Sequence, residues 1–98
     1  MVINSDGAVP TAAGDDAIAI GRSASAADNS NIAIGDNADA SNQDDGIAIG
    51  TDSVSSGLSS IAFGHTAEAT STSAVAIGFN TDAGHAGSVA IGLSLIHI

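Results

Sequence analysis

The sequence feature that most constrains the fold is a four-residue phrase: a large apolar residue, alanine, a second large apolar residue and glycine. It occurs six times, and the starts of successive copies are offset by 14, 15, 14, 14 and 14 positions along the chain. A fixed period of this kind indicates a solenoid, in which each repeat forms one coil. Because a helical crossover between parallel strands does not fit into so short a repeat, each coil must consist of strands and turns.

Each repeat contains two short stretches with the alternation of a β-strand. In the first, β-branched residues alternate with alanine, and β-branched residues favour extended backbone. In the second, small residues alternate at a set distance after the glycine: Ala24 and Ala26, Ala38 and Ala40, Ser53 and Ser55, Ala67 and Ala69, Thr81 and Ala83. The sequence therefore predicts an all-β, parallel β-roll solenoid of about six 14-residue coils with two short strands per coil, about 29 Å long at the usual strand spacing.

The alternation in the first strand also predicts which residues form the core and which face outward. We expect the large members to pack between the two sheets, against the small residues of the second strand: Ile18, Ile20, Ile32, Ile34, Ile47, Ile49, Ile61, Phe63, Val75, Ile77, Val89 and Ile91. The alanines between them are then expected outside, where a second copy could pack closely: Ala19, Ala33, Ala48, Ala62, Ala76 and Ala90. The alternative is that alanine is merely tolerated there in an alanine-rich chain. Glycines at the strand ends are expected to begin the turns: Gly21, Gly35, Gly50, Gly64, Gly78 and Gly92.

Composition excludes several classes of function. The formal net charge is −10, and Arg22 is the only basic residue besides the histidines. Binding to a phosphate backbone needs several Lys or Arg residues, so a nucleic-acid partner is not expected. The chain has no cysteine, which rules out disulfides and cysteine-based zinc sites. No apolar run approaches the length of a membrane span, so direct membrane insertion of this segment is not expected.

Residues with catalytic or metal-binding chemistry are present but not arranged in a known pattern. His65 follows a repeat glycine and His85 lies in a glycine-rich link, and neither recurs in the other coils. Aspartates crowd the first half and could attract calcium, but neither the EF-hand spacing nor a calcium-binding nonapeptide is present: Asp15, Asp16, Asp36, Asp39, Asp44, Asp45 and Asp52. Turn aspartates also bond their own backbone and keep a surface soluble. We therefore expect no enzymatic activity, no metal and no cofactor.

The repeated phrase resembles the head repeats of trimeric autotransporter adhesins, the YadA-like heads. Ala74-Val75-Ala76-Ile77-Gly78 and Ser88-Val89-Ala90-Ile91-Gly92 are the closest copies, and the resemblance covers residues 17–92. It implies a left-handed β-roll assembled as a parallel homotrimer. It also implies a place on the outer membrane of a Gram-negative bacterium, above a stalk and an anchor, and attachment to extracellular matrix, host cells or surfaces.

The two ends depart from the repeat. Residues 1–16 are interpreted as a degenerate or fraying N-terminal coil, because polar residues replace the large apolar ones there. Residues 93–98 are expected to be a non-repeat tail that does not belong to the biological sequence, because bulky residues replace small ones. Since the stalk and anchor of the family are not recognisable, the chain is expected to be a fragment.

Exposed residues of the second strand and the links are the expected ligand contacts, with Asp39, Glu68 and His85 as candidates. The alternative to a bacterial adhesin head is a phage tail fibre or another structural solenoid. An ice-binding solenoid is a weaker alternative, because a regular threonine file is missing. A calcium-binding solenoid is also weaker, because the known calcium-binding patterns are missing. The ligand and the source organism stay open.

Overall fold

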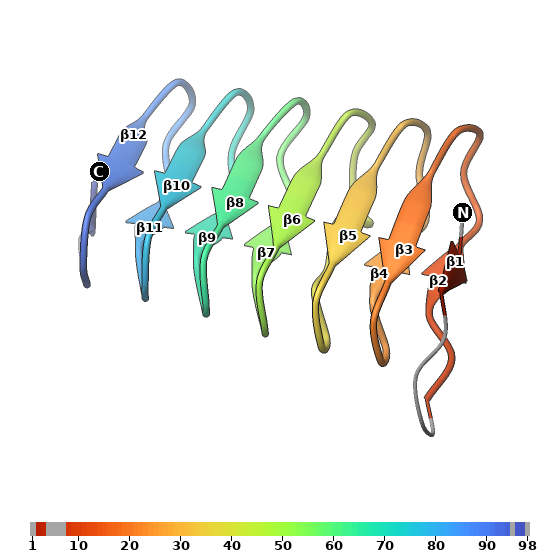
Figure 1. The fold of residues 1–98 in the computed structure, drawn as a ribbon. Helices are drawn as coiled ribbons and strands as arrows, with labels where there is room; N and C mark the ends of the chain where they lie inside the picture. The colour runs from red at the N-terminus through yellow and green to blue at the C-terminus, as the bar shows by residue number, and fades with distance from the viewer. Residues whose placement is uncertain (1, 4–7, 95, 98) are drawn as a thin grey trace.

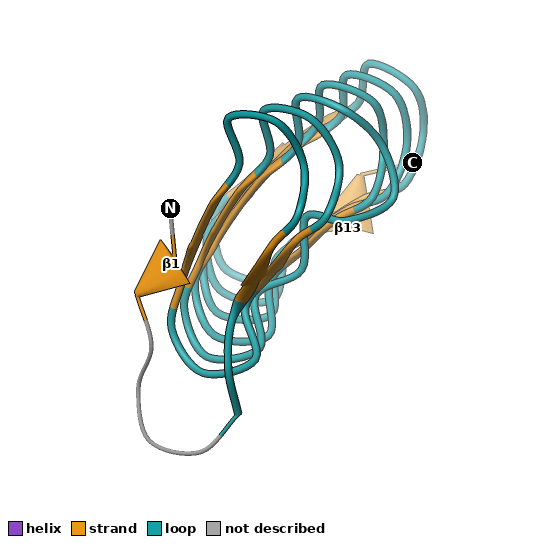
Figure 2. Cartoon of the chain, turned by 90° about the vertical axis from the view of Figure 1, so that its right-hand side faces the viewer, coloured by secondary structure: helices purple, strands orange, loops and turns teal. Residues whose placement is uncertain are grey.

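The computed structural model describes residues 2–3, 8–94 and 96–97, and within them the chain is a β-solenoid without helices. Figure 1 shows the coils side by side along one axis, and Figure 2 shows the flattened ring that each coil makes. The molecule measures 34 × 23 × 12 Å. The strands are β1 (Val2–Ile3), β2 (Thr11–Ala12), β3 (Ile18–Ile20), β4 (Ser25–Ala26), β5 (Ile32–Ile34), β6 (Ile47–Ile49), β7 (Val54–Ser55), β8 (Ile61–Phe63), β9 (Glu68–Ala69), β10 (Val75–Ile77), β11 (Asp82–Ala83), β12 (Val89–Ile91) and β13 (Ile96–His97). The predicted fold class is confirmed.

The strands form two parallel sheets that face each other across the interior of the roll. The first sheet has the order β1-β3-β5-β6-β8-β10-β12. The second consists of two parts, β2-β4 and β7-β9-β11-β13. Asp39 connects them through isolated bridges to Ser25 and Val54. Ile32 pairs with Ile47 and Ala33 with Ala48, so the strands stay in phase across the longer coil that begins at Ile32.

Two tight turns complete each coil, and both contain a residue with positive φ. In the turn after β5, the Ala38 N–H donates to the Gly35 carbonyl at 3.3 Å, and Asn37 has a φ of 62°. This is the sign pattern of a type II turn. Equivalent turns follow β3, β6 and β8. After β10, Asn80 has the same positive φ and the Thr81 hydroxyl donates to the Gly78 carbonyl. We call this side of the roll the glycine edge. The turns after the second strands, such as the one in which Ser60 N–H donates to Gly57, form the link edge.

The interior of the roll contains almost only small side chains. The six alanines of the first strands, from Ala19 to Ala90, have no exposed surface, and the small residues of the second strands are buried opposite them. The largest fully buried side chains are those of Asn31, Thr81 and three serines. Because each coil is so short, the two sheets lie too close together for larger groups. The assignment of the alanines to the outer face, and so to a trimer interface, is therefore wrong.

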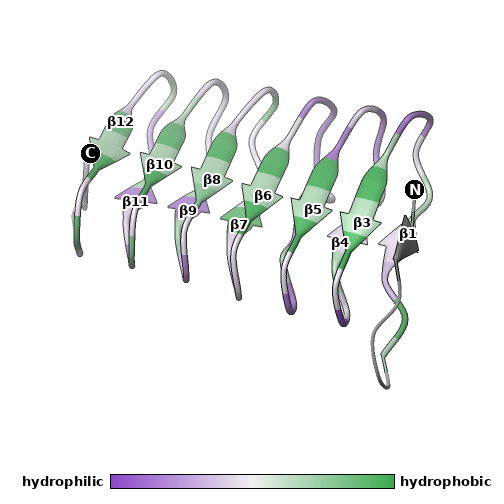
Figure 3. Ribbon diagram, in the orientation of Figure 1, coloured by the Kyte–Doolittle hydropathy of each residue, from purple (hydrophilic) through white to green (hydrophobic). Residues whose placement is uncertain are grey.

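The large residues of the first strands lie outside the roll, which corrects the predicted core. Phe63 is 50% exposed and Ile91 60% exposed, and the remaining members are half-buried or exposed. We call this surface the aliphatic face: Ile18, Ile20, Ile32, Ile34, Ile47, Ile49, Ile61, Phe63, Val75, Ile77, Val89 and Ile91. Figure 3 shows the apolar stretches repeating along the first sheet. From side-chain size alone, the large residues are expected inside and the alanines outside. The interior is too thin for large side chains, so the arrangement is reversed.

Asn31 accommodates the one coil that has an extra residue. Its side chain is buried, its amide nitrogen donates to the Ala40 carbonyl, and its Oδ1 accepts from the Gly46 N–H at 2.7 Å. In the other coils the equivalent N–H donates to a carbonyl of its own turn, as Ser60 does to Gly57. The Asn31 side chain thus accepts the hydrogen bond that the Gly46 N–H cannot make within its own, longer turn.

Both ends of the chain continue the sheets. At the N-terminus β1 pairs with β3, Val2 with Ala19, which is a longer offset than the repeat, while β2 pairs with β4 at the regular offset, Thr11 with Ser25. At the C-terminus β13 pairs with β11, Asp82 with Ile96, so the backbone of the tail keeps the register of the repeat although its residue types do not. Of the residues interpreted as a degenerate first coil, 1 and 4–7 lie outside the described part, as do 95 and 98 of the predicted tail.

Candidate interaction surface

The aliphatic face is an apolar surface that extends along the first sheet from β3 to β12. Consecutive strands present their outward residues in two files, because the ladder pairs identical positions: Ile61 with Val75 and Val75 with Val89. The alanines between the files point into an interior that is already filled. The large side chains therefore have no place inside their own chain. An exposed apolar surface of this continuity marks a site of association in a soluble protein.

Sequence reasoning did not identify this surface, although a signal for it is present. Each coil has four buried positions, as Ala17, Ala19, Ala24 and Ala26 show for the first: one just before the first strand, one inside it, one just before the second strand and one at its end. These positions carry small residues in every copy apart from Asn31. Four such positions are enough to fill a two-sheet roll. The large residues are then left over, and must lie outside.

The outward face of the second sheet is polar and acidic. Its central file consists of Ser25, Asp39, Val54, Glu68 and Asp82, which are neighbours in register. Asp39 is half-buried and accepts a hydrogen bond from the Ser41 hydroxyl, whereas Glu68 is exposed. Two of the three predicted ligand contacts, Asp39 and Glu68, thus share one face. Toward the C-terminal end of this face, the carboxylates of Glu68 and Asp82 are neighbours.

The third predicted contact, His85, lies on the link edge instead. It is exposed, and the Ser88 hydroxyl accepts a hydrogen bond from its backbone N–H at 3.3 Å. Leu58 is also on this edge and is 41% exposed. The structure therefore does not bring His85 together with Asp39 and Glu68.

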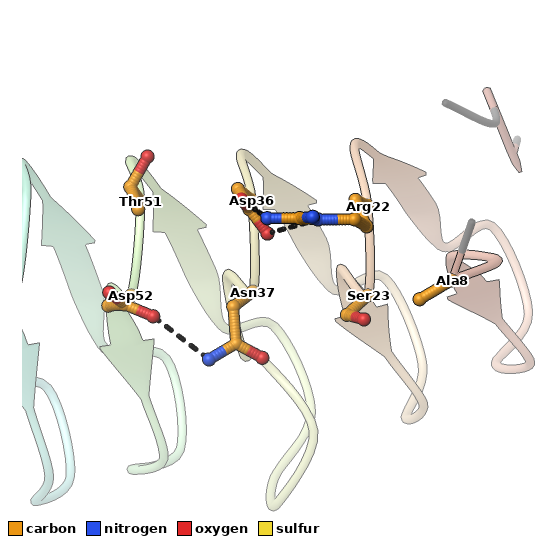
Figure 4. A pocket seen from close by; sticks show the side chains of 7 residues that line it. All are labelled: Ala8, Arg22, Ser23, Asp36, Asn37, Thr51 and Asp52. Atoms are coloured by element: carbon orange, nitrogen blue, oxygen red, sulfur yellow. Dashed lines mark hydrogen bonds and ion pairs between the residues drawn. The ribbon is translucent and has the colours of Figure 1, made fainter. Parts of the chain in front are cut away.

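The glycine edge begins with a ladder of polar side chains that lines a shallow hollow of about 550 Å³ (Figure 4). Arg22 binds Asp36 in the next coil through two hydrogen bonds, one of them from Nε to Oδ1 at 3.2 Å. One coil further, the Asn37 amide donates to Asp52 at 2.9 Å. The hydrogen bonds from Arg22 lower the pKa of Asp36, and those to Asp36 raise the pKa of Arg22. The ladder stabilises neighbouring coils and leaves the carboxylates partnered.

The glycine edge changes character toward the C-terminus. The position that Arg22 and Asp36 occupy in the early coils is taken by His65, Phe79 and Leu93 in the later ones. The rings of His65 and Phe79 stack, with centroids 5.3 Å apart and planes 6° apart. Phe79 is nevertheless 48% exposed and Leu93 76% exposed. An apolar strip thus runs along this edge beside the exposed end of the aliphatic face.

Neither a metal centre nor a membrane-spanning helix is found in the described residues. No three His, Asp or Glu side chains in ranges 2–3, 8–94 and 96–97 come close enough to hold a metal ion. The same ranges contain no helix that could span a lipid bilayer.

Comparison with known families identifies the repeat. A family model described as the YadA head domain repeat, which spans two copies of the repeat, matches the chain at residues 12–38, 32–53, 41–67, 55–81 and 69–94. The overlapping matches cover the coils from β2 to the residues that follow β12. No curated protein sequence matches the chain significantly.

Proposed function

Because the chain belongs to the YadA head domain repeat family, which supplies the heads of trimeric autotransporter adhesins, we propose that it works as an adhesive homotrimer. Three parallel copies would cover one another's aliphatic faces and present their polar faces outward. A stalk and an outer-membrane anchor would hold the head at the surface of a Gram-negative bacterium. The partners of the polar faces would be extracellular matrix, host cells or other surfaces.

The observation that carries this proposal is the position of the large apolar side chains. They are outside a roll whose interior alanines are fully buried, so association with another molecule would remove them from water. Moving a fully exposed Ile, Val or Phe side chain out of water contributes about 1.5–3 kcal/mol. Every chain presents twelve such side chains, and those that are already half-buried contribute less than this. A closed ring of identical copies covers the aliphatic face of every copy, whereas an open assembly leaves the faces of its end copies exposed.

The outward file of the second sheet is the proposed ligand surface. In a trimer with the aliphatic faces inward, this file lies on the outside of each copy. Its residues recur once per coil, and three copies multiply them again. Repetition of weak contacts raises the overall avidity without a deep pocket. Asp39 and Glu68 are the proposed contacts on this face, with His85 at its edge.

Retention of the full chain on a film of solubilised extracellular matrix tests the proposal, with an albumin film as the reference. The wild type should be retained on the matrix, and D39N/E68Q should dissociate faster at unchanged molecular mass. I77E, which places a charge on the aliphatic face, should be monomeric and lose about 10²–10⁴-fold in avidity. N42A, an exposed change in a link, should behave as the wild type.

Equal retention on matrix and albumin would contradict the adhesive role. Loss of retention in N42A to the same extent as in I77E would contradict the avidity argument, because Asn42 lies away from the aliphatic face.

A further inference from the structure

The edges of the roll carry apolar residues that neither the aliphatic face nor the ligand surface uses. On the link edge Leu58 is 41% exposed. On the glycine edge the stacked rings of His65 and Phe79 remain largely open to water, with Phe79 48% exposed. The two groups lie on opposite edges of one molecule, so they cannot contact each other within a chain.

Their heights along the solenoid axis are nearly the same. Leu58 precedes His65 by half of one coil. At about 4.8 Å per coil, this places Leu58 about 2–3 Å from the level of His65 along the axis. Thr72 lies between the levels of His65 and Phe79, and it is a smaller residue on the same link edge as Leu58.

A closed threefold arrangement brings these edges together. If three flat rolls turn their aliphatic faces to a common axis, the glycine edge of each roll meets the link edge of the next, because contacts in such a ring are heterologous. Copies that run parallel meet at equal height. The apolar groups of the two edges therefore coincide at the level of β7 and β8.

On these grounds, and resting on the homotrimer of the proposed function, we propose that Leu58 of one copy packs against the His65–Phe79 ring pair of the next copy. The partner in this contact is a second copy of this chain, because Leu58 and the His65–Phe79 pair lie on opposite edges of the roll at nearly the same height along the solenoid axis. It continues the aliphatic face at each of the three corners. The polar ladder at the other end of the glycine edge has its side chains already partnered, which leaves the apolar end for association.

Disulfide trapping tests this contact, and the absence of native cysteine makes the result easy to read. In the double variant L58C/H65C, oxidation should link neighbouring copies into a covalent trimer on a non-reducing gel. T72C/F79C should give the same product. A disulfide needs Cα atoms within about 7 Å, so the two cysteines of one chain cannot pair across the roll. L58C or H65C alone should stay monomeric on the gel.

Light scattering of the same samples separates the two proposals. A trimer in solution whose two double variants both stay uncrosslinked would overturn the corner contact and leave the homotrimer standing. A covalent dimer from L58C alone would show a twofold contact and overturn the corner contact as well. A monomer in solution would overturn the homotrimer on which the contact rests.

Discussion

Gly64 lies directly against Gly78 in the next coil, with no room for a side chain between them. A Cβ atom placed on Gly64 would lie 2.4 Å from the Gly78 carbonyl oxygen, and the φ of Gly64 is 143°. Gly21, Gly35 and Gly50 stand in the same relation to the glycine of the following coil. This file lets the coils stack at the ordinary strand spacing at one edge of the roll.

G64A should therefore strongly destabilise the solenoid. We expect a loss of about 2–5 kcal/mol, from the disfavoured φ together with the displacement of the neighbouring backbone. Thermal unfolding at a fixed chain concentration, followed by circular dichroism, measures the effect. G84A is the matched control, because its Cβ would meet only ordinary contacts, the nearest at 3.5 Å. Equal melting temperatures for the two variants would contradict the close stacking.

N31A should destabilise the fold through the coil that has the extra residue. The substitution leaves the Ala40 carbonyl and the Gly46 N–H without the partners that the amide provides. A buried polar group without a partner costs about 1–3 kcal/mol. Urea unfolding should show this loss in N31A and almost none in N42A, whose side chain is exposed in the same coil. A small effect for N31A would mean that water replaces the amide.

A62L should disrupt the roll from inside. Ala62 is fully buried between the sheets, and added methyl groups in a filled interior cost about 1–3 kcal/mol or more. E68A changes a side chain that points to solvent from the second sheet and should be nearly neutral. Melting temperatures of the two variants make the comparison. Tolerance of leucine at this position would contradict the thin interior.

D36N should change how stability depends on pH. Hydrogen bonds from Arg22 lower the pKa of Asp36 in the folded chain. The ion pair therefore contributes fully above the ordinary titration range of a carboxyl group, and the contribution disappears as the pH falls through the lowered pKa of Asp36. The wild type should melt slightly higher than D36N near neutral pH, and the difference should shrink in acid and in high salt because both side chains are exposed. A difference that grows in acid would contradict this sign.

The fold could be predicted from the sequence because its signals are periodic. The regular spacing of the phrase sets the coils. Alternation marks both strands, even in the coil where Asp39 forms isolated bridges to Ser25 and Val54 instead of a strand. Positive φ at the turns was not predictable, since Ser23, Asn37 and Thr66 share little beyond their small size and polarity.

The faces of the first strand could not be assigned from alternation alone. A period of two says that Ala62 and Phe63 lie on opposite sides, but it does not say which side is inside. The decision needs the distance between the sheets, which the small residues of all four interior positions set. The contact role of Leu58 and Phe79 could not be predicted for another reason. Each occurs in a single coil, so the repeat pattern does not mark its position as apolar.

The molecular mass of the full chain in solution tests the central claim most directly. Size-exclusion chromatography with light scattering should give three times the chain mass of 9.3 kDa. I61E, on the aliphatic face, should fall to the mass of one chain with its β-sheet circular dichroism retained. V54E, an outward aliphatic residue of the second sheet, should remain a trimer. A folded wild type with the mass of one chain, or equal loss of mass in I61E and V54E, would contradict the assignment of the aliphatic face as the surface that joins the copies.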